Sequence, residues 1–291
     1  MGTFDRSKSR SIQPVDYDIF TIVKIVAMQY TRQMQKLLVV NKPIGVTPYQ
    51  VIQTLREQHP PYQKEKISYV GRLDPLAHGV LLLTVGAANN TREAYLSLPK
   101  EYECEALFGL ATDTYDLLGL VQNLSIKKVP DLLEEKIATT IKSYVGKQQQ
   151  SYPPFSSKAV HGKPLFWWAK QDRLSEITIP TREISVTDFT LLSLNACSRN
   201  ELEKKVSVAI SVQGDFRQEA IKKRWETFFT TNTQSSFVTA RLHVSCSSGT
   251  YIRSFINRLG ESLGCYAVAT EIMRTSVGAY SVDSAINLTL E

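Results

Sequence analysis

The most constraining stretch of the sequence is residues 71–79, which the apolar run 80–85 follows directly. The run is short and rich in leucine and valine, and this predicts a buried strand. The segment before it holds two glycines and a proline, which predict a loop with a fixed path. Asp74 lies in that loop immediately before Pro75, so its backbone is restricted to the extended region. A carboxylate held in this way can be aimed at a ligand, or it can accept hydrogen bonds from turn amides.

The composition bounds the class of protein. The 291 residues are enough for one large domain or two small ones. With 43% hydrophobic and 21% charged residues, the chain is typical of soluble globular proteins. The 34 Lys and Arg residues outnumber the 28 Asp and Glu residues, so the net charge is +6, which is compatible with a polyanionic partner. No apolar stretch approaches the length that spans a membrane and no signal peptide is recognisable, so we expect a cytoplasmic protein.

The cysteines and histidines give no sign of a metal site. The four cysteines include no pair at Cys-x-x-Cys spacing, and no two of the four histidines are close enough in sequence to suggest shared ligation. So few cysteines in a chain of this length also argue against a disulfide framework. We interpret them as reduced core residues and predict no metal; they are Cys104, Cys197, Cys246 and Cys265.

Hydrophobic periodicity predicts the main helices and strands. Thr47 can cap a helix that Pro48 begins, because threonine is a good N-cap and proline suits the first helical position. The predicted strands are 37–40, 80–85, 101–108, 184–194, 205–212 and 237–246, and the predicted helices are 48–57, 131–145, 216–229 and 251–263. Strands outnumber helices and do not alternate with them regularly, so we predict an α+β fold with a mixed, mostly antiparallel sheet flanked by helices.

Residues 71–81, Gly-Arg-Leu-Asp-Pro-Leu-Ala-His-Gly-Val-Leu, resemble the catalytic motif of the TruB-type pseudouridine synthases, which isomerise a uridine in the T loop of tRNA. The resemblance runs from about residue 36 to about residue 282, and its segments follow the order of the family. The other matching segments are 40–47 (Val-Asn-Lys-Pro-Ile-Gly-Val-Thr), 100–102 (Lys-Glu-Tyr), 153–158 (Pro-Pro-Phe-Ser-Ser-Lys), 162–166 (Gly-Lys-Pro-Leu-Phe) and 249–253 (Gly-Thr-Tyr-Ile-Arg). The resemblance implies the pseudouridine synthase fold and the isomerisation of uridine 55 of tRNA.

The resemblance also implies roles for individual residues. Asp74 matches the catalytic carboxylate, and one carboxylate suits a reaction that breaks a glycosidic bond. Tyr102 matches the tyrosine that packs against the target base and is a candidate for proton transfer. Arg253 matches the arginine that pairs with the carboxylate, while Lys42 and Tyr251 match positions near the active site. The reaction has no redox step, so we expect no cofactor.

Two positions depart from the family pattern, and one segment is expected to grip RNA. The target uridine must flip out of its loop, and Tyr69 stands where a histidine usually fills the gap that it leaves. Arg72 stands where small residues are usual. Residues 147–175 match an RNA-gripping lobe, in which Lys158 is expected to meet phosphate. Tyr69, Tyr102, Tyr251 and the lobe's tryptophans can alternatively be packing residues.

We expect residues 1–33 to be a poorly ordered extension, with Met34 a plausible start, and residues 34–291 to form the catalytic domain. A C-terminal RNA-binding PUA domain, which family members often carry, is expected to be absent. The expected partner is the T-arm stem-loop of tRNA, with no obligate protein partner and a monomeric enzyme. Two alternatives stay open: a non-catalytic tRNA-binding or folding factor, and a guide-RNA-dependent ribosomal RNA pseudouridine synthase.

Overall fold

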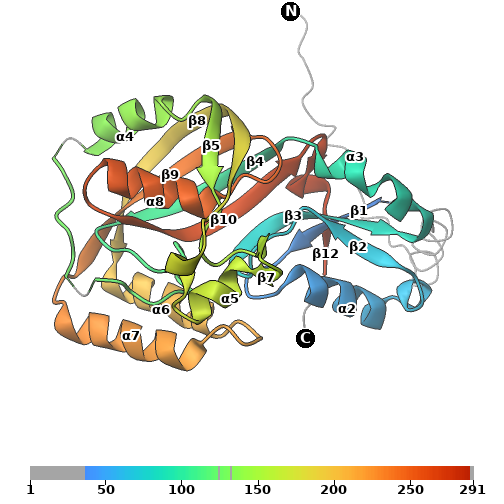
Figure 1. Ribbon diagram of the computed structural model, residues 1–291, viewed down its shortest axis with the longest axis horizontal. Helices are drawn as coiled ribbons and strands as arrows, with labels where there is room; N and C mark the ends of the chain where they lie inside the picture. The colour runs from blue at the N-terminus through green and yellow to red at the C-terminus, as the bar shows by residue number, and fades with distance from the viewer. Residues whose placement is uncertain (1–36, 124, 132, 289–291) are drawn as a thin grey trace, which may run out of the picture.

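One mixed β-sheet runs through the computed structural model, which describes residues 37–123, 125–131 and 133–288 (Figure 1). The ten-stranded sheet has the order β12-β1-β3-β10-β4-β9-β8-β5, with β2 paired to β3 and β11 paired to β10. Its pairs are antiparallel, apart from β1 with β12 and β3 with β10, which are parallel. The predicted α+β class and the mixed, mostly antiparallel sheet are therefore confirmed.

The strands and helices have the following bounds. The strands of the sheet are β1 Leu37–Lys42, β2 Ile67–Val70, β3 Ala77–Val85, β4 Lys100–Phe108, β5 Gly146–Ser151, β8 Thr181–Ser198, β9 Ser236–Cys246, β10 Ala267–Val277, β11 Tyr280–Ser281 and β12 Ile286–Asn287, and a separate small hairpin pairs β6 Ala159–Val160 with β7 Lys163–Pro164. The helices are α2 Pro48–Gln58, α3 Arg92–Leu96, α4 Leu133–Lys142, α5 Leu165–Lys170, α6 Arg199–Ile210, α7 Gln218–Thr231 and α8 Ile252–Ser262. Within the described residues, none of these helices is long and apolar enough to cross a membrane.

The central strands send alternate side chains to opposite faces of the sheet, as the twofold period of a strand requires. In β4, Ala106 and Phe108 belong to the main core, to which α2, α4 and α8 contribute their apolar faces. Leu107 points the other way, into a second core that α6 and α7 close. The sheet is thus covered by helices on both faces, and α6 and α7 lie together at the lower left of Figure 1.

Most of the predicted elements are present, with boundaries shifted by a few residues. The helix predicted over 48–57 is α2, and its Thr47 N-cap forms a capping box with Gln50. The strand predicted over 80–85 is β3, which is buried along almost its whole length. The helix predicted over 251–263 is α8, whose buried residues include Phe255 and Leu259.

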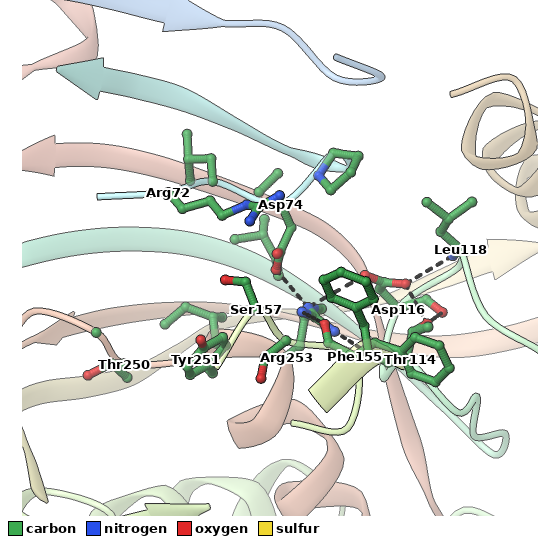
Figure 2. A pocket seen from close by; sticks show the side chains of 18 of the residues that line it. Arg72, Asp74, Thr114, Asp116, Leu118, Phe155, Ser157, Thr250, Tyr251 and Arg253 are labelled. Carbon is green, nitrogen blue, oxygen red and sulfur yellow. Dashed lines mark hydrogen bonds and ion pairs between the residues drawn. The ribbon is translucent and has the colours of Figure 1, made fainter. Parts of the chain in front are cut away.

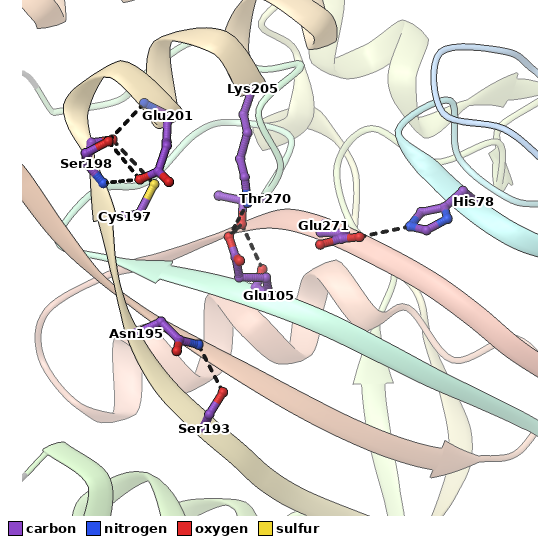
Figure 3. A network of polar contacts seen from close by, with 10 residues as sticks. All are labelled: His78, Glu105, Ser193, Asn195, Cys197, Ser198, Glu201, Lys205, Thr270 and Glu271. Atoms are coloured by element: carbon purple, nitrogen blue, oxygen red, sulfur yellow. Dashed lines mark hydrogen bonds and ion pairs between the residues drawn. The ribbon is translucent and has the colours of Figure 1, made fainter.

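The strand predicted over residues 205–212 is wrong, because this segment belongs to helix α6. The alternation of valines suggested a strand, but Val208 is 52% exposed, whereas Leu202 and Val206 are buried at helical spacing. Ser198 and Glu201 form a capping box that starts the helix, visible in Figure 3. That Ser-x-x-Glu pattern was the sequence signal for a helix start. Lys205 of α6 bonds Glu105 of β4 and thereby ties the helix to the sheet.

The other segment predictions concern the ends and the lobe. Residues 1–33, with the predicted extension and Met34, lie outside the described residues. Residues 147–175 comprise β5 from its second residue, the β6–β7 hairpin and α5. Within them, Trp168 is buried and its indole donates to the carbonyl of Val160 at 3.1 Å, so it packs the lobe.

Helix α8 approaches β10 so closely that Gly260 has no room for a side chain. A Cβ at Gly260 would lie 2.1 Å from the backbone nitrogen of Ala267. We expect Gly260→Ala to lower the free energy of unfolding by about 1–3 kcal/mol, because the helix and the strand must move apart. Urea unfolding followed by circular dichroism measures this. Glu261→Ala, on the exposed side of the same helix, is the control and should change little; equal midpoints for both variants would contradict the steric argument.

Candidate active site

A cavity of about 480 Å³ opens where the β2–β3 loop faces the start of α8 and the lobe (Figure 2). Five of the eight residues predicted for the site line it: Arg72, Asp74, Tyr102, Tyr251 and Arg253. They come from the β2–β3 loop, β4 and the beginning of α8, which are far apart in the sequence. Polar groups from distant segments therefore converge on one hollow, as is typical of binding and active sites.

The carboxylate of Asp74 faces this cavity and is held by Arg253. Nε of Arg253 donates to Oδ2 of Asp74 at 2.8 Å, as Figure 2 shows. The Asp74 side chain keeps 33% of its surface exposed, whereas that of Arg253 keeps only 4%. The aspartate can therefore meet a ligand while its partner lies in the protein interior.

Arg253 is held on several sides in addition to Asp74. Its Nε lies 3.5 Å from Oδ2 of Asp116, Nη1 donates to the carbonyl of Thr114, and Nη2 donates to the carbonyl of Phe155 at 3.5 Å. Burial by itself lowers the pKa of Arg253, but the carboxylates of Asp74 and Asp116 outweigh it and the pKa is raised. The guanidinium is therefore a fixed positive charge with a single orientation.

Asp116 is a second carboxylate that the sequence analysis missed. It is buried, accepts from Oγ1 of Thr114 at 2.6 Å and from the amide of Leu118 at 3.0 Å, and lines the cavity. Burial raises its pKa, while Arg253 and the hydrogen bond from Thr114 oppose that rise. The aspartates and threonines at 112–116 are typical of a polar turn. No local pattern indicated that Asp116 of this turn contacts Arg253.

Lys42 lies close to the site but does not line the cavity. It is fully buried, and its ammonium donates to the carbonyls of Pro43, Val46 and Pro75 at 3.0, 2.6 and 3.2 Å. Burial lowers its pKa to about 7, and the carboxylate of Asp74 opposes that shift. Because Pro75 follows Asp74 directly, Lys42 fixes the path of the loop that carries Asp74.

Tyr102 stands beside Arg274 on neighbouring strands. The two residues are paired in the register of β4 and β10, and both line the cavity. Burial raises the pKa of Tyr102, and the Arg274 guanidinium opposes the rise, so the phenol stays protonated near neutral pH. Arg274, which the sequence analysis also missed, donates to the carbonyls of Val80 and Gly71 at 2.7 and 3.0 Å and holds the two ends of the motif together.

The remaining predicted residues lie at different depths. Tyr251, the N-cap of α8, lines the cavity, and Gln150 bonds its amide and carbonyl at 2.8 and 3.0 Å. Arg72 lines the cavity and is exposed. Neither Tyr69 nor Lys158 lines the cavity. Tyr69 is partly buried in β2 and packs against the main core, and the ammonium of Lys158 lies over the ring of Tyr152.

Potential metal ligands do not cluster in the part of the chain that the structure describes. No group of three or more His, Cys, Asp or Glu side chains there is arranged to hold a metal ion. The four cysteines are buried and unpaired with one another.

Known proteins resemble this chain over most of its length. The family described as TruB family pseudouridylate synthase (N terminal domain) matches residues 59–217. A tRNA pseudouridine synthase B from Clostridioides difficile is 30% identical over 257 residues, which cover 88% of this chain and 69% of that protein. Its counterpart from Lactobacillus johnsonii is 31% identical over 252 residues, or 87% of this chain and 71% of that protein.

Solved structures show the same fold. A chain of a Cbf5-Nop10-Gar1 complex superimposes with a TM-score of 0.54 at 20% identity. The match covers 90% of this chain and 54% of that one, so this chain spans about half the length of the solved chain. This agreement confirms the pseudouridine synthase fold that the motifs implied.

Removing Arg253 should destabilise the protein in a pH-dependent way. Arg253→Met leaves Asp116 buried without its counter-charge, and we expect a loss of about 3–5 kcal/mol in the free energy of unfolding. Burial already raises the folded-state pKa of Asp116 and Arg253 opposes that rise, so the pKa rises further in the variant. A raised carboxyl pKa makes the folded state less stable as the pH rises, and the variant therefore loses more stability than the unaltered protein at high pH. Urea unfolding of this variant should therefore show a smaller loss at pH 5 than at pH 8.

The matched control for this measurement is Arg258→Met. Arg258 is an exposed arginine of the same helix that bonds Gln148, and it should lose less than about 1 kcal/mol at either pH. A loss of that small size for Arg253→Met, or one equal at both pH values, would contradict the interpretation of Arg253 as a buried counter-ion.

Proposed function

The chain belongs to the TruB family of pseudouridylate synthases, and we propose that it isomerises uridine 55 in the T loop of tRNA to pseudouridine. The observation that carries this proposal is the ion pair between Asp74, which faces the cavity, and the buried Arg253. The names of the relatives support tRNA as the substrate, and the excess of basic residues fits a polyanion.

The reaction places specific demands on such a site. The bond between N1 of uracil and C1′ of the ribose breaks, a bond between C5 and C1′ forms, C5 loses a proton and N1 gains one. The carboxylate of Asp74 suits the first step, since it can stabilise or trap the cationic sugar carbon. Its hydrogen bond to Arg253 leaves the other carboxylate oxygen available to the cavity. The isomerisation involves no net oxidation or reduction. We propose that neither a cofactor nor a metal takes part.

Arg253 and Tyr102 are proposed to assist in different ways. Arg253 orients the Asp74 carboxylate and fixes its position. Tyr102 presents a protonated phenol in the cavity wall, and we propose that it packs against the uracil ring and directs the late proton transfer. We propose that Lys42 assists by holding the loop that carries Asp74. Tyr251 is proposed to contact the substrate as part of the cavity wall.

A flipped nucleotide is the form of substrate that the cavity can accept. The uridine of a folded loop must leave its stack before its glycosidic bond can be reached. The cavity volume of about 480 Å³ is in the range of pockets that enclose small ligands. We further propose that residues 147–175, with Lys158, grip the T arm, that Arg72 contacts the RNA, and that the enzyme acts as a cytoplasmic monomer without an obligate protein partner.

The overall proposal is tested by mapping pseudouridine in tRNA transcribed without modifications, before and after incubation with the protein. Conversion at position 55 supports the proposal. Binding without conversion would point to a tRNA-binding or folding factor. Conversion only of ribosomal RNA, and only with a guide RNA and partner proteins, would identify a guide-RNA-dependent ribosomal RNA pseudouridine synthase.

Asp74→Asn should abolish isomerisation and leave tRNA affinity nearly unchanged. The amide keeps the shape of the carboxylate but supplies neither its charge nor its nucleophilicity. Release of tritium from tRNA labelled at C5 of uridine measures turnover, and a filter-binding titration measures affinity. Asp131→Asn, at a side chain that is 92% exposed, serves as the control and should behave as the unaltered protein. Turnover by a pure Asp74→Asn sample would exclude Asp74 as the catalytic carboxylate.

For Tyr69 we propose the stacking role that its position in the motif implies. Base–aromatic stacking contributes roughly 1–3 kcal/mol, so Tyr69→Ala should weaken productive binding by about that amount, while Tyr69→Phe and Tyr69→His lose much less. Binding and turnover of T-arm RNA are measured beside the melting temperature. If Tyr69→Ala melts much earlier but turnover per folded molecule is unchanged, Tyr69 is a core residue, the alternative that its contact with the main core favours.

A further inference from the structure

Three cationic side chains, Lys100, Arg182 and Arg274, line the same cavity as Asp74. The Lys100 ammonium donates to the carbonyls of Leu96 and Leu98, and Arg274 donates to the motif carbonyls described above. Within the described residues, no Asp or Glu side chain forms an ion pair with any of the three. The cavity wall therefore carries positive charge that the protein itself does not neutralise.

Arg182 differs from the other two because its guanidinium has no hydrogen-bond partner in the described part of the chain. Its Nε is buried and unpaired, although the residue is only partly buried and lines the cavity. A guanidinium that lines a cavity and has no partner among the described residues can donate to a ligand that enters the cavity. A guanidinium offers donors in a planar fork, which matches the oxygens of a phosphate.

The turn at residues 247–251 leaves room for the guanidinium of Arg182. A Cβ at Gly249 would lie 1.7 Å from Nη1 of Arg182, so the guanidinium rests where any other residue would put its side chain. The turn itself is fixed to β8, because the amide of Ser247 donates to the carbonyl of Ser185 at 2.7 Å and Oγ of Ser247 accepts from the Ser185 amide at 2.9 Å. The guanidinium of Arg182 thus lies against a turn that is itself fixed to the sheet.

The cations also lie beside the catalytic loop. A Cβ at Gly71 would be 3.6 Å from Nη1 of Arg274 and 3.6 Å from Cε of Lys100, and Gly71 begins the loop that carries Asp74. Burial and the nearby charges of Arg274 and Arg182 lower the pKa of Lys100 to about 8. An anion bound between Lys100 and Arg182 would relieve this repulsion of like charges.

We propose that Arg182, together with Lys100, binds a phosphodiester group of the substrate RNA next to the nucleotide that enters the cavity. This rests on the proposed function, because the ligand is taken to be the backbone of the RNA whose uridine reaches Asp74. The subsite would hold the backbone at one point while the base turns into the cavity. Phosphate contacts position a nucleic acid without reading its sequence, so this subsite would not select the base.

A scan with neutral linkages tests this subsite. T-arm stem-loop RNAs, each with a single uncharged methylphosphonate linkage, are titrated against the full chain and against Arg182→Gln. For the unaltered protein, one linkage adjacent to the target uridine should weaken binding by about tenfold. Arg182→Gln should bind the native RNA about tenfold more weakly and be insensitive to that linkage. Its slope of log affinity against log salt should be smaller by about 1.

Control variants separate the subsite from general charge and from folding. Arg241→Gln removes an arginine of the same sheet that pairs with Glu103 outside the cavity, and it should keep the full sensitivity to the linkage. Arg182→Lys keeps the charge but not the fork, and it should retain part of the sensitivity even if Arg182→Gln folds poorly. If the sensitive linkage stays equally sensitive in both Arg182 variants, or if no adjacent linkage is sensitive in the unaltered protein, the proposal is overturned.

Two further measurements distinguish the source of the anion and the function of the site. If inorganic phosphate raises the melting temperature of the unaltered protein but not of Arg182→Gln, while the linkage scan shows no effect, the site binds a free anion and not RNA. Pseudouridine formation is measured in the same samples. Product without a sensitive linkage refutes the subsite alone, whereas a sensitive linkage without product refutes the proposed function and leaves the phosphate contact standing.

Discussion

The buried guanidinium of Arg253 is the group on which the site's geometry depends. It lies in the first turn of α8, where the helix dipole disfavours a positive charge, and the carboxylates of Asp74 and Asp116 compensate. Through hydrogen bonds and ion pairs it joins the β2–β3 loop, the segment after β4 and the lobe. A buried ion pair becomes very unfavourable once one partner is lost, so these three segments are held in a single arrangement.

The charges that line the cavity suit the proposed polyanionic substrate, while one carboxylate stays available. Seven lysines and arginines line the cavity with only three aspartates. Some of these charges are matched inside the protein, as Lys170 is by Asp215 and Arg253 by Asp74 and Asp116. The unmatched cations would attract the phosphates of the proposed substrate, and the cationic sugar carbon of the proposed reaction would find its counter-charge at Asp74. The backbone and the reacting carbon of a nucleotide thus have separate and complementary electrostatic environments.

Local sequence patterns predicted the fold well, and the site less completely. The run 80–85 and the capping threonine before α2 are local signals, and both elements are present. The motifs brought Asp74 and Arg253 to one site, and the structure places them 2.8 Å apart. Asp116, Arg182 and Arg274 were missed because their roles come from contacts with residues far away in the sequence, which no local period encodes. The segment 205–212 was misassigned because β-branched apolar residues at every second position are typical of a strand. The capping box upstream, however, begins a helix that includes most of the segment.

The segment from the end of β9 through α8 links the two parts of the site. The guanidinium of Arg182 lies against its turn at Gly249, and three residues after Gly249 the helix begins and carries Arg253. At the other end of α8, Gly260 lets the helix lie against the backbone of Ala267 and so sets its depth above the sheet. Two positions without side chains, one in the turn and one in the helix, therefore make room for the Arg182 guanidinium and for the close approach of α8 to β10. The cationic part of the cavity wall and the arginine that bonds Asp74 thus depend on the backbone path of one turn and one helix.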